Sequence, residues 1–138
     1  MTALAAADRW AELLRGGAEG LTQRPAPRVW SPLEYGAHVR DVIRLFTERV
    51  AVIVSTDSPR FVGWDQEAAA TAARYDQMEP AIIAEEIAAD TDRLVRIIDA
   101  LSEGDWGRSG TRDGREFTVE FLLRYLLHDV EHHWYDVS

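Results

Sequence analysis

Apolar residues recur at helical spacing in four segments of the chain, and this pattern limits the fold more than any other sequence feature. The segments run from about Ala3 to Arg15, from Ser31 to Val54, from Pro80 to Leu101, and from Thr118 through Trp134. In each segment, apolar side chains three or four residues apart form one stripe along a helix. Four amphipathic helices bury such stripes by packing together, so the sequence predicts an all-α four-helix bundle, with one domain spanning residues 1–138.

Local signals mark where two of these helices begin. Ser31 is a good N-cap residue, Pro32 suits the first helical position, and Glu34 lies where a capping box needs it. Thr118 is the N-cap candidate of the last helix, and Gly16-Gly17 ends the first one. The helix boundaries are therefore predicted from residue chemistry as well as from periodicity.

Two connecting segments carry further signals. Arg60 to Gln77 is irregular, with a loop around Trp64 followed by a short alanine-rich helix from Glu67 to Arg74. Trp64 is a large aromatic residue in a polar loop, and is either a lid packed on the core or a substrate contact. Glu103 to Arg115 holds four glycines among polar residues, which predicts a short hairpin before the last helix.

Composition excludes several classes of function. The chain has no cysteine, which rules out disulfides, thiolate nucleophiles and cysteine-based metal sites. The net charge of −9 argues against a nucleic-acid partner, because phosphate binding needs a basic surface. No apolar run approaches the roughly 20 residues of a membrane span, and no signal peptide is evident. We expect a cytoplasmic protein with no membrane partner.

The last helix contains two pairs of possible metal ligands at i,i+4 spacing. These are His128 with His132, and Asp129 with His133. On a helical wheel His133 falls inside the apolar arc and Asp129 falls at its margin. His128 and His132 fall outside the arc, so we predict that they face solvent. Asp129 and His133 are then the better ligand candidates, although replacement by the other pair stays open.

His38 is the third candidate, at the flank of the apolar stripe of the second helix. Imidazole and carboxylate groups from facing bundle helices are ordinary ligands for zinc and its neighbours. The competing interpretation is structural: His38 bonds a backbone carbonyl, and a metal-free Asp–His pair is tied to Arg40 or Tyr125. Asp136 is either an acceptor that holds the His133 ring or a solvated acid at the helix end.

Two segments carry a resemblance to a known family. Residues 30–41, with Trp30 two helical turns before His38, and residues 128–137, with its ligand pair followed by a polar residue, resemble the two ligand motifs of the DinB-like superfamily. That superfamily includes metal-dependent thiol S-transferases and the N-terminal domain of mycothiol-dependent maleylpyruvate isomerase. The resemblance implies a four-helix bundle over nearly the whole chain and a metal held by His38, Asp129 and His133.

The chain departs from the family pattern at one ligand. Family members usually place histidine or glutamate at the position of Asp129, and the carboxylate of aspartate reaches less far. This departure motivates an alternative hypothesis, in which a degraded site leaves a non-catalytic module that binds a small ligand. A further alternative is a homodimer that uses the apolar residues Trp10 and Leu14 of the first helix.

The resemblance implies an enzyme that uses a divalent metal, with zinc expected first and nickel, iron or manganese also compatible. It would be a thiol-dependent S-transferase or isomerase, or a hydrolase, acting on a small-molecule substrate. Because the chain lacks cysteine, its nucleophile would be a cofactor thiol or a water activated by the metal. The alanine- and arginine-rich composition favours mycothiol as that thiol. Trp64, Trp134 and Tyr135 are the candidate walls of the cofactor pocket.

Overall fold

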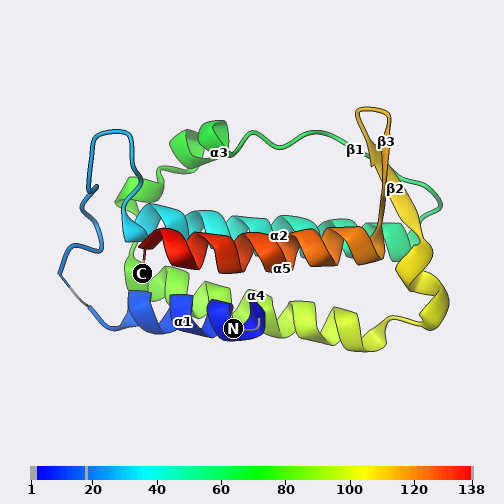
Figure 1. Cartoon of the computed structure of the whole chain (residues 1–138), viewed down its shortest axis with the longest axis horizontal. Coiled ribbons are helices and arrows are strands. Elements are labelled where there is room, and N and C mark those ends of the chain that lie inside the picture. The colour runs from blue at the N-terminus through cyan, green and yellow to red at the C-terminus, as the bar shows by residue number, and fades with distance from the viewer. Residues whose placement is uncertain (1–2, 18, 138) are drawn as a thin grey trace.

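The structure, a computed structural model, describes residues 3–17 and 19–137 and is built from four long helices (Figure 1). The long helices are α1 (Ala3–Arg15), α2 (Pro32–Ser55), α4 (Pro80–Ala100) and α5 (Val119–Val137). The smaller elements are α3 (Gln66–Ala73), the 3-10 turns η1 (Tyr75–Gln77) and η2 (Glu103–Gly107), and the strands β1 (Arg60–Phe61), β2 (Ser109–Arg112) and β3 (Arg115–Thr118). The predicted four-helix bundle is confirmed.

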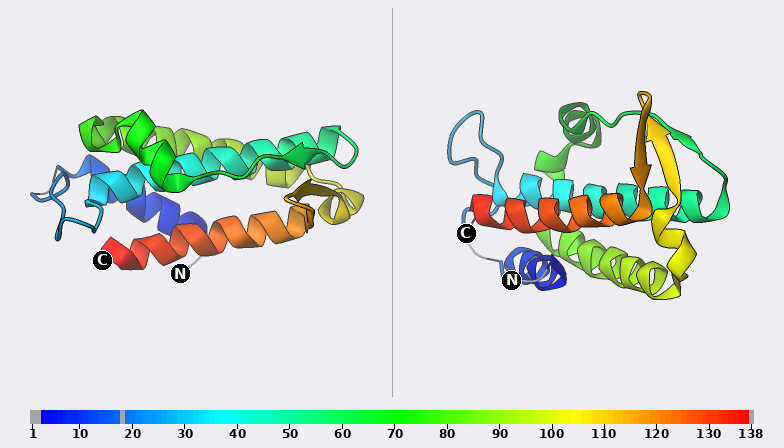
Figure 2. Two further views of the ribbon diagram at one scale, coloured as in Figure 1. Left: turned by 90° about the horizontal axis from the view of Figure 1, so that it is seen from above. Right: turned by 45° about the vertical axis from the view of Figure 1, so that its right-hand side comes forward.

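The order of the helices around the bundle differs from their order along the chain. α1 packs mainly against α4 and α5, and α2 packs mainly against the same two helices. The consecutive helices α1 and α2 therefore lie across the bundle from each other, with far fewer contacts (Figure 2). They meet where a Cβ atom on Gly36 would lie 2.6 Å from Leu14 Cδ1, so a glycine permits this approach.

The core consists of the apolar stripes that the sequence predicted. Trp10 and Leu14 of α1 are completely buried among residues of the other helices. These two residues were the candidates for a dimer contact, and their burial inside one bundle removes them from any surface that a second subunit could reach. Among the described residues, no helix is both long and apolar enough to cross a membrane.

The N-terminus of α2 is fixed by the predicted capping box. The Ser31 hydroxyl accepts a hydrogen bond from the Glu34 backbone, and the Glu34 side chain accepts one from the Ser31 backbone, each at 3.1 Å. Arg24 also donates to the Glu34 carboxylate, with Nε 2.8 Å from Oε1. His38 lies one helical turn beyond Glu34, so this cap helps to set the direction in which its ring projects.

The predicted hairpin lies outside the bundle, on the side of α2 and α5 that also carries α3 (Figure 1). β2 and β3 pair antiparallel, and Asp113 and Gly114 connect them with φ angles of 54° and 77°. An Asp-Gly pair with positive φ angles is favoured in such two-residue turns. β1, in a segment predicted as loop, adds to β2 in parallel; two residues are too few to show a strand pattern.

The last helix begins at the predicted residue. Thr118 Oγ1 accepts a hydrogen bond from the backbone N–H of Phe121 at 3.1 Å, which is the role of an N-cap side chain. The hairpin and α5 are thus joined without a loop, so the position of β3 is tied to that of α5.

Replacing Ser31 by alanine should lower the free energy of unfolding by about 1 kcal/mol, because the first turn of α2 loses its side-chain cap. Urea denaturation followed by circular dichroism measures this change. Ser55→Ala is the matched control: its exposed hydroxyl bonds only the helix's own carbonyls, and its effect should stay within about 0.5 kcal/mol. Equal losses in the two variants would contradict the capping role.

Candidate metal centre

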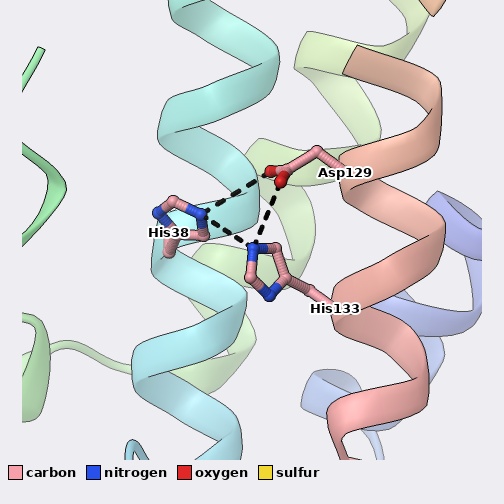
Figure 3. A group of neighbouring side chains, drawn as sticks. All are labelled: His38, Asp129 and His133. Atoms are coloured by element: carbon pink, nitrogen blue, oxygen red, sulfur yellow. Dashed lines mark hydrogen bonds and ion pairs between the residues drawn. The ribbon is translucent and has the colours of Figure 1, made fainter. Parts of the chain in front are cut away.

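Three side chains from α2 and α5 converge between the two helices (Figure 3). His38 projects from α2, and Asp129 and His133 project from consecutive turns of α5. The Nε2 atoms of His38 and His133 are 3.1 Å apart. Asp129 Oδ1 lies 3.4 Å from His133 Nε2, and its Oδ2 lies 3.7 Å from His38 Nε2. The structure therefore brings together the three residues that the sequence singled out as ligand candidates.

The spacing of these donor atoms suits a metal ion. Ligand atoms about 2.0–2.1 Å from a tetrahedral zinc ion lie roughly 3.3 Å from one another. The three observed separations of 3.1, 3.4 and 3.7 Å lie around that value. The shorter side chain of Asp129 thus still reaches the two imidazoles, and three protein ligands with a fourth position free are the arrangement of a catalytic site.

Asp129 and His133 influence each other's ionisation strongly. Burial favours a neutral Asp129, but hydrogen bonds to His133 and His38 and their charges outweigh it and hold the pKa of Asp129 well below its ordinary value. Burial also disfavours a charged His133, yet Asp129 and then Asp136 raise the pKa of His133 above its ordinary value. The carboxylate therefore stays ionised, as a metal ligand must be.

Neighbouring groups hold the two imidazole rings in place. His133 Nδ1 lies 2.9 Å from Asp136 Oδ2, so Nδ1–H donates to that carboxylate and Nε2 points at the cluster. This confirms the prediction that Asp136 holds the ring. His38 is held differently: its Nδ1 is buried without a hydrogen-bond partner among the described residues. Its ring instead stacks on Trp64, with centroids 5.7 Å apart and planes at 10°.

A cavity of about 290 Å³ opens beside the cluster, and both His38 and Asp129 line it. Its walls come from α2, α5, the β2–β3 hairpin and the segment around Trp64. Trp64 is therefore both a cavity wall and a packing partner of His38, which combines the two roles left open by the sequence. The free side of the three-residue cluster thus faces a space of the size that small-molecule sites occupy.

The other two candidate wall residues lie elsewhere. Trp134 packs edge-on against the buried ring of Trp10, with centroids 5.7 Å apart, and so belongs to the bundle core. Tyr135 is 59% exposed and does not line the cavity. Both follow His133 directly in sequence, but successive residues of a helix project about 100° apart and so reach different surroundings.

The remaining alternatives of the sequence analysis are also resolved by position. His128 and His132 are exposed, as predicted, and their rings stack on one another. Arg40 pairs with Asp41 and Glu86 rather than with Asp129. Tyr125 lines the cavity, but no hydrogen bond joins it to Asp129 within the described ranges.

Several site residues escaped the sequence analysis. Tyr35 lies against His133, with ring centroids 5.6 Å apart. Arg49, Arg112 and Arg115 line the cavity. Arg49 gave a usable signal, because it follows Phe46 by three residues and lies at the edge of the apolar stripe. The two hairpin arginines gave none, since their place depends on how the hairpin folds back over the bundle.

Comparison with known proteins bears on both the family and the fold. The family model of the DinB superfamily matches residues 3–137. No curated protein matches the chain significantly. Among solved structures, YfiT from Bacillus subtilis, described as a probable metal-dependent hydrolase with an unusual four-helix bundle topology, aligns with a TM-score of 0.80. The alignment has 15% identity and covers 98% of this chain and 81% of that chain, so it establishes a common fold.

Asp129→Asn should lower the pKa of the His133 imidazole in the metal-free protein, because the neutral amide no longer stabilises the imidazolium. Asp136→Asn should lower the same pKa by less, since Asp136 contributes less than Asp129 does. Titration of the His133 ring resonances by NMR measures both shifts. A larger effect of Asp136→Asn, or no effect of either change, would contradict this account of the cluster.

Proposed function

This chain belongs to the DinB superfamily, and from that premise we propose that it is a metal-dependent enzyme whose ion is held by His38, Asp129 and His133. The observation that carries the proposal is the cluster itself. Its three donor atoms lie 3.1–3.7 Å apart, on two helices, beside a cavity large enough for a small substrate. Zinc suits two imidazoles and a carboxylate, and nickel, iron or manganese are also compatible with them.

A divalent ion bound there would act as a Lewis acid and lower the pKa of a water or thiol. The chain's own residues provide the setting for that chemistry. Asp136 keeps the His133 ring in one tautomer and orientation. Trp64 and Trp30 pack on His38, at 5.7 and 5.4 Å between ring centroids, and shield it from water. A dry, fixed set of ligands strengthens every electrostatic interaction within the site.

The nucleophile comes from outside the chain. No serine, threonine, lysine or cysteine is found among the residues that line the cavity, and the sequence has no cysteine at all. Two sources remain, a water molecule and a low-molecular-weight thiol. Water agrees with the hydrolase description of YfiT. A thiol, with mycothiol as the first candidate, agrees with the thiol S-transferases and the isomerase domain that the superfamily includes.

A non-catalytic module that binds a small ligand is the alternative. It was motivated by aspartate standing at position 129, where the family usually has histidine or glutamate. The distances of 3.4 and 3.7 Å from Asp129 to the two imidazoles favour a working metal site over a degraded one. Metal binding therefore separates the two hypotheses before any substrate is known.

Purified, tag-free protein should contain about one equivalent of a divalent transition metal, and His133→Ala should lose it, because two remaining ligands hold such an ion poorly. Inductively coupled plasma mass spectrometry measures the content. His132→Ala is the matched control: its imidazole is exposed on the same helix and should be dispensable.

Two results would contradict the metal site. One is a wild-type protein that is empty and also fails to take up added zinc or nickel. The other is equal metal loss from His132→Ala and His133→Ala, which would point to the solvent-facing pair of histidines instead.

The cobalt(II)-loaded protein should separate the two nucleophiles. If a thiol is the nucleophile, adding mycothiol should produce an intense sulfur-to-cobalt absorption in the near ultraviolet, because the thiolate binds the open metal position. Glutathione serves as the comparison thiol, and His133→Ala as the protein control. Absence of this absorption with either thiol would exclude the transferase branch and leave water as the nucleophile.

A further inference from the structure

The cavity beside the metal cluster has two ends of opposite charge. Asp129 stands at one end, with His38 next to it. Three arginines, Arg49, Arg112 and Arg115, line other parts of the wall. This concentration of positive charge is unexpected in a chain with a net charge of −9.

Arg49 is buried without an acidic partner. It is 7% exposed, and its guanidinium donates one hydrogen bond, from Nη2 to the backbone carbonyl of Val62 at 2.8 Å. Its neighbour on α2, Arg40, is equally buried but pairs with Asp41 and Glu86. Buried charges are normally paired, so Arg49 retains an unmet need for an anion.

The hairpin arginines add to this need. Arg112 has one carboxylate in reach, that of the exposed residue Asp113, at 4.0 Å. Arg115 forms no hydrogen bond or ion pair with any described residue. Burial lowers the pKa of Arg49, and the nearby charge of Arg112 lowers it further. Repulsion between these guanidinium groups is relieved when an anion lies between them.

A row of aromatic rings forms the apolar wall of the same cavity. Phe46 stacks on Tyr125, Tyr125 on Phe121, and Phe121 lies against Phe117, with centroids 5.6, 6.3 and 5.4 Å apart. The guanidinium groups of Arg49 and Arg112 lie over the two ends of this row, 5.9 Å from Phe46 and 5.4 Å from Phe117. Phe121 and Tyr125 are about half exposed, at 49% and 52%, which leaves apolar surface for a ligand to cover.

We propose that this cavity selects a small aromatic carboxylate, whose ring lies along the aromatic row and whose carboxylate is bound by Arg49, Arg112 and Arg115. The planar fork of a guanidinium matches a carboxylate and binds it with two hydrogen bonds. The volume of about 290 Å³ limits the ligand to roughly one ring with a short side chain. The placement of the reactive group at the metal rests on the function proposed above.

The test uses 3-phenylpropionate as the probe and neutral 3-phenylpropanamide as its isostere. Calorimetry at low salt, on metal-free and zinc-loaded full-length protein, measures both affinities. The carboxylate should bind the metal-free protein about tenfold more tightly than the amide, since charge-assisted hydrogen bonds are the stronger ones. Equal binding of the two probes would overturn the proposal.

Variants locate the anion. Arg112→Gln and Arg115→Gln, combined, should abolish most of the preference for the carboxylate. Both side chains lie on the hairpin and outside the core, so the fold should survive; a thermal melt checks this. Arg124→Gln is the matched control: it removes an equal charge from an exposed site on α5 and should leave the preference intact. An unchanged preference in the double variant would overturn the proposal.

His133→Ala separates this inference from the proposed function. The variant should keep its preference for the carboxylate even though it no longer binds metal. A preference that appears only with zinc, and disappears in His133→Ala, would place the carboxylate on the metal and overturn the arginine assignment. A wild-type protein that binds no metal would refute the metalloenzyme proposal, while the metal-free measurement would still decide the anion site.

Discussion

The antiparallel packing of α2 against α5 is the constraint on which the rest of the structure depends. His38 meets His133 at one end of this interface, and Phe46 meets Tyr125 further along it. The same register thus sets the ligand cluster and the cavity wall. A change of one residue on α5 would rotate its side chains by about 100° and remove Asp129 and His133 from the interface. The buried stripes of the two helices hold that register, so core packing determines the geometry of the polar site.

The polar groups at this interface carry a cost that the remaining core offsets. His38 and Arg49 are both buried on α2 and lack the partners that such groups usually have. Local arrangements that oppose stability are expected at functional sites, where a ligand completes them. A metal ion would complete the cluster around His38, and a carboxylate would complete the surroundings of Arg49. The two groups lie two to three helical turns apart on α2, which places both within the span of one small ligand.

The elements outside the bundle determine what the cavity admits. The β2–β3 hairpin contributes Arg112, Arg115 and Phe117, and the segment before α3 contributes Trp64. These segments lie on the same side of α2 and α5, as Figure 1 shows. A four-helix bundle with the same cluster but different outer segments would present a different cavity. In a superfamily with one fold, selectivity for substrates can therefore change while the metal ligands stay fixed.

The sequence by itself determined the bundle, the ends of the helices and the three residues of the cluster. Periodicity identifies the buried face of each helix, and Ser31 and Thr118 cap helices through local hydrogen bonds, which need no knowledge of the fold. What periodicity does not reveal is which buried face meets which. Trp134 lies on the inner side of α5 but meets Trp10 of α1, whereas Tyr35 meets His133. The arginine end of the cavity was likewise decided by tertiary structure alone, because Arg49 and the hairpin are distant in sequence and come together when the chain folds.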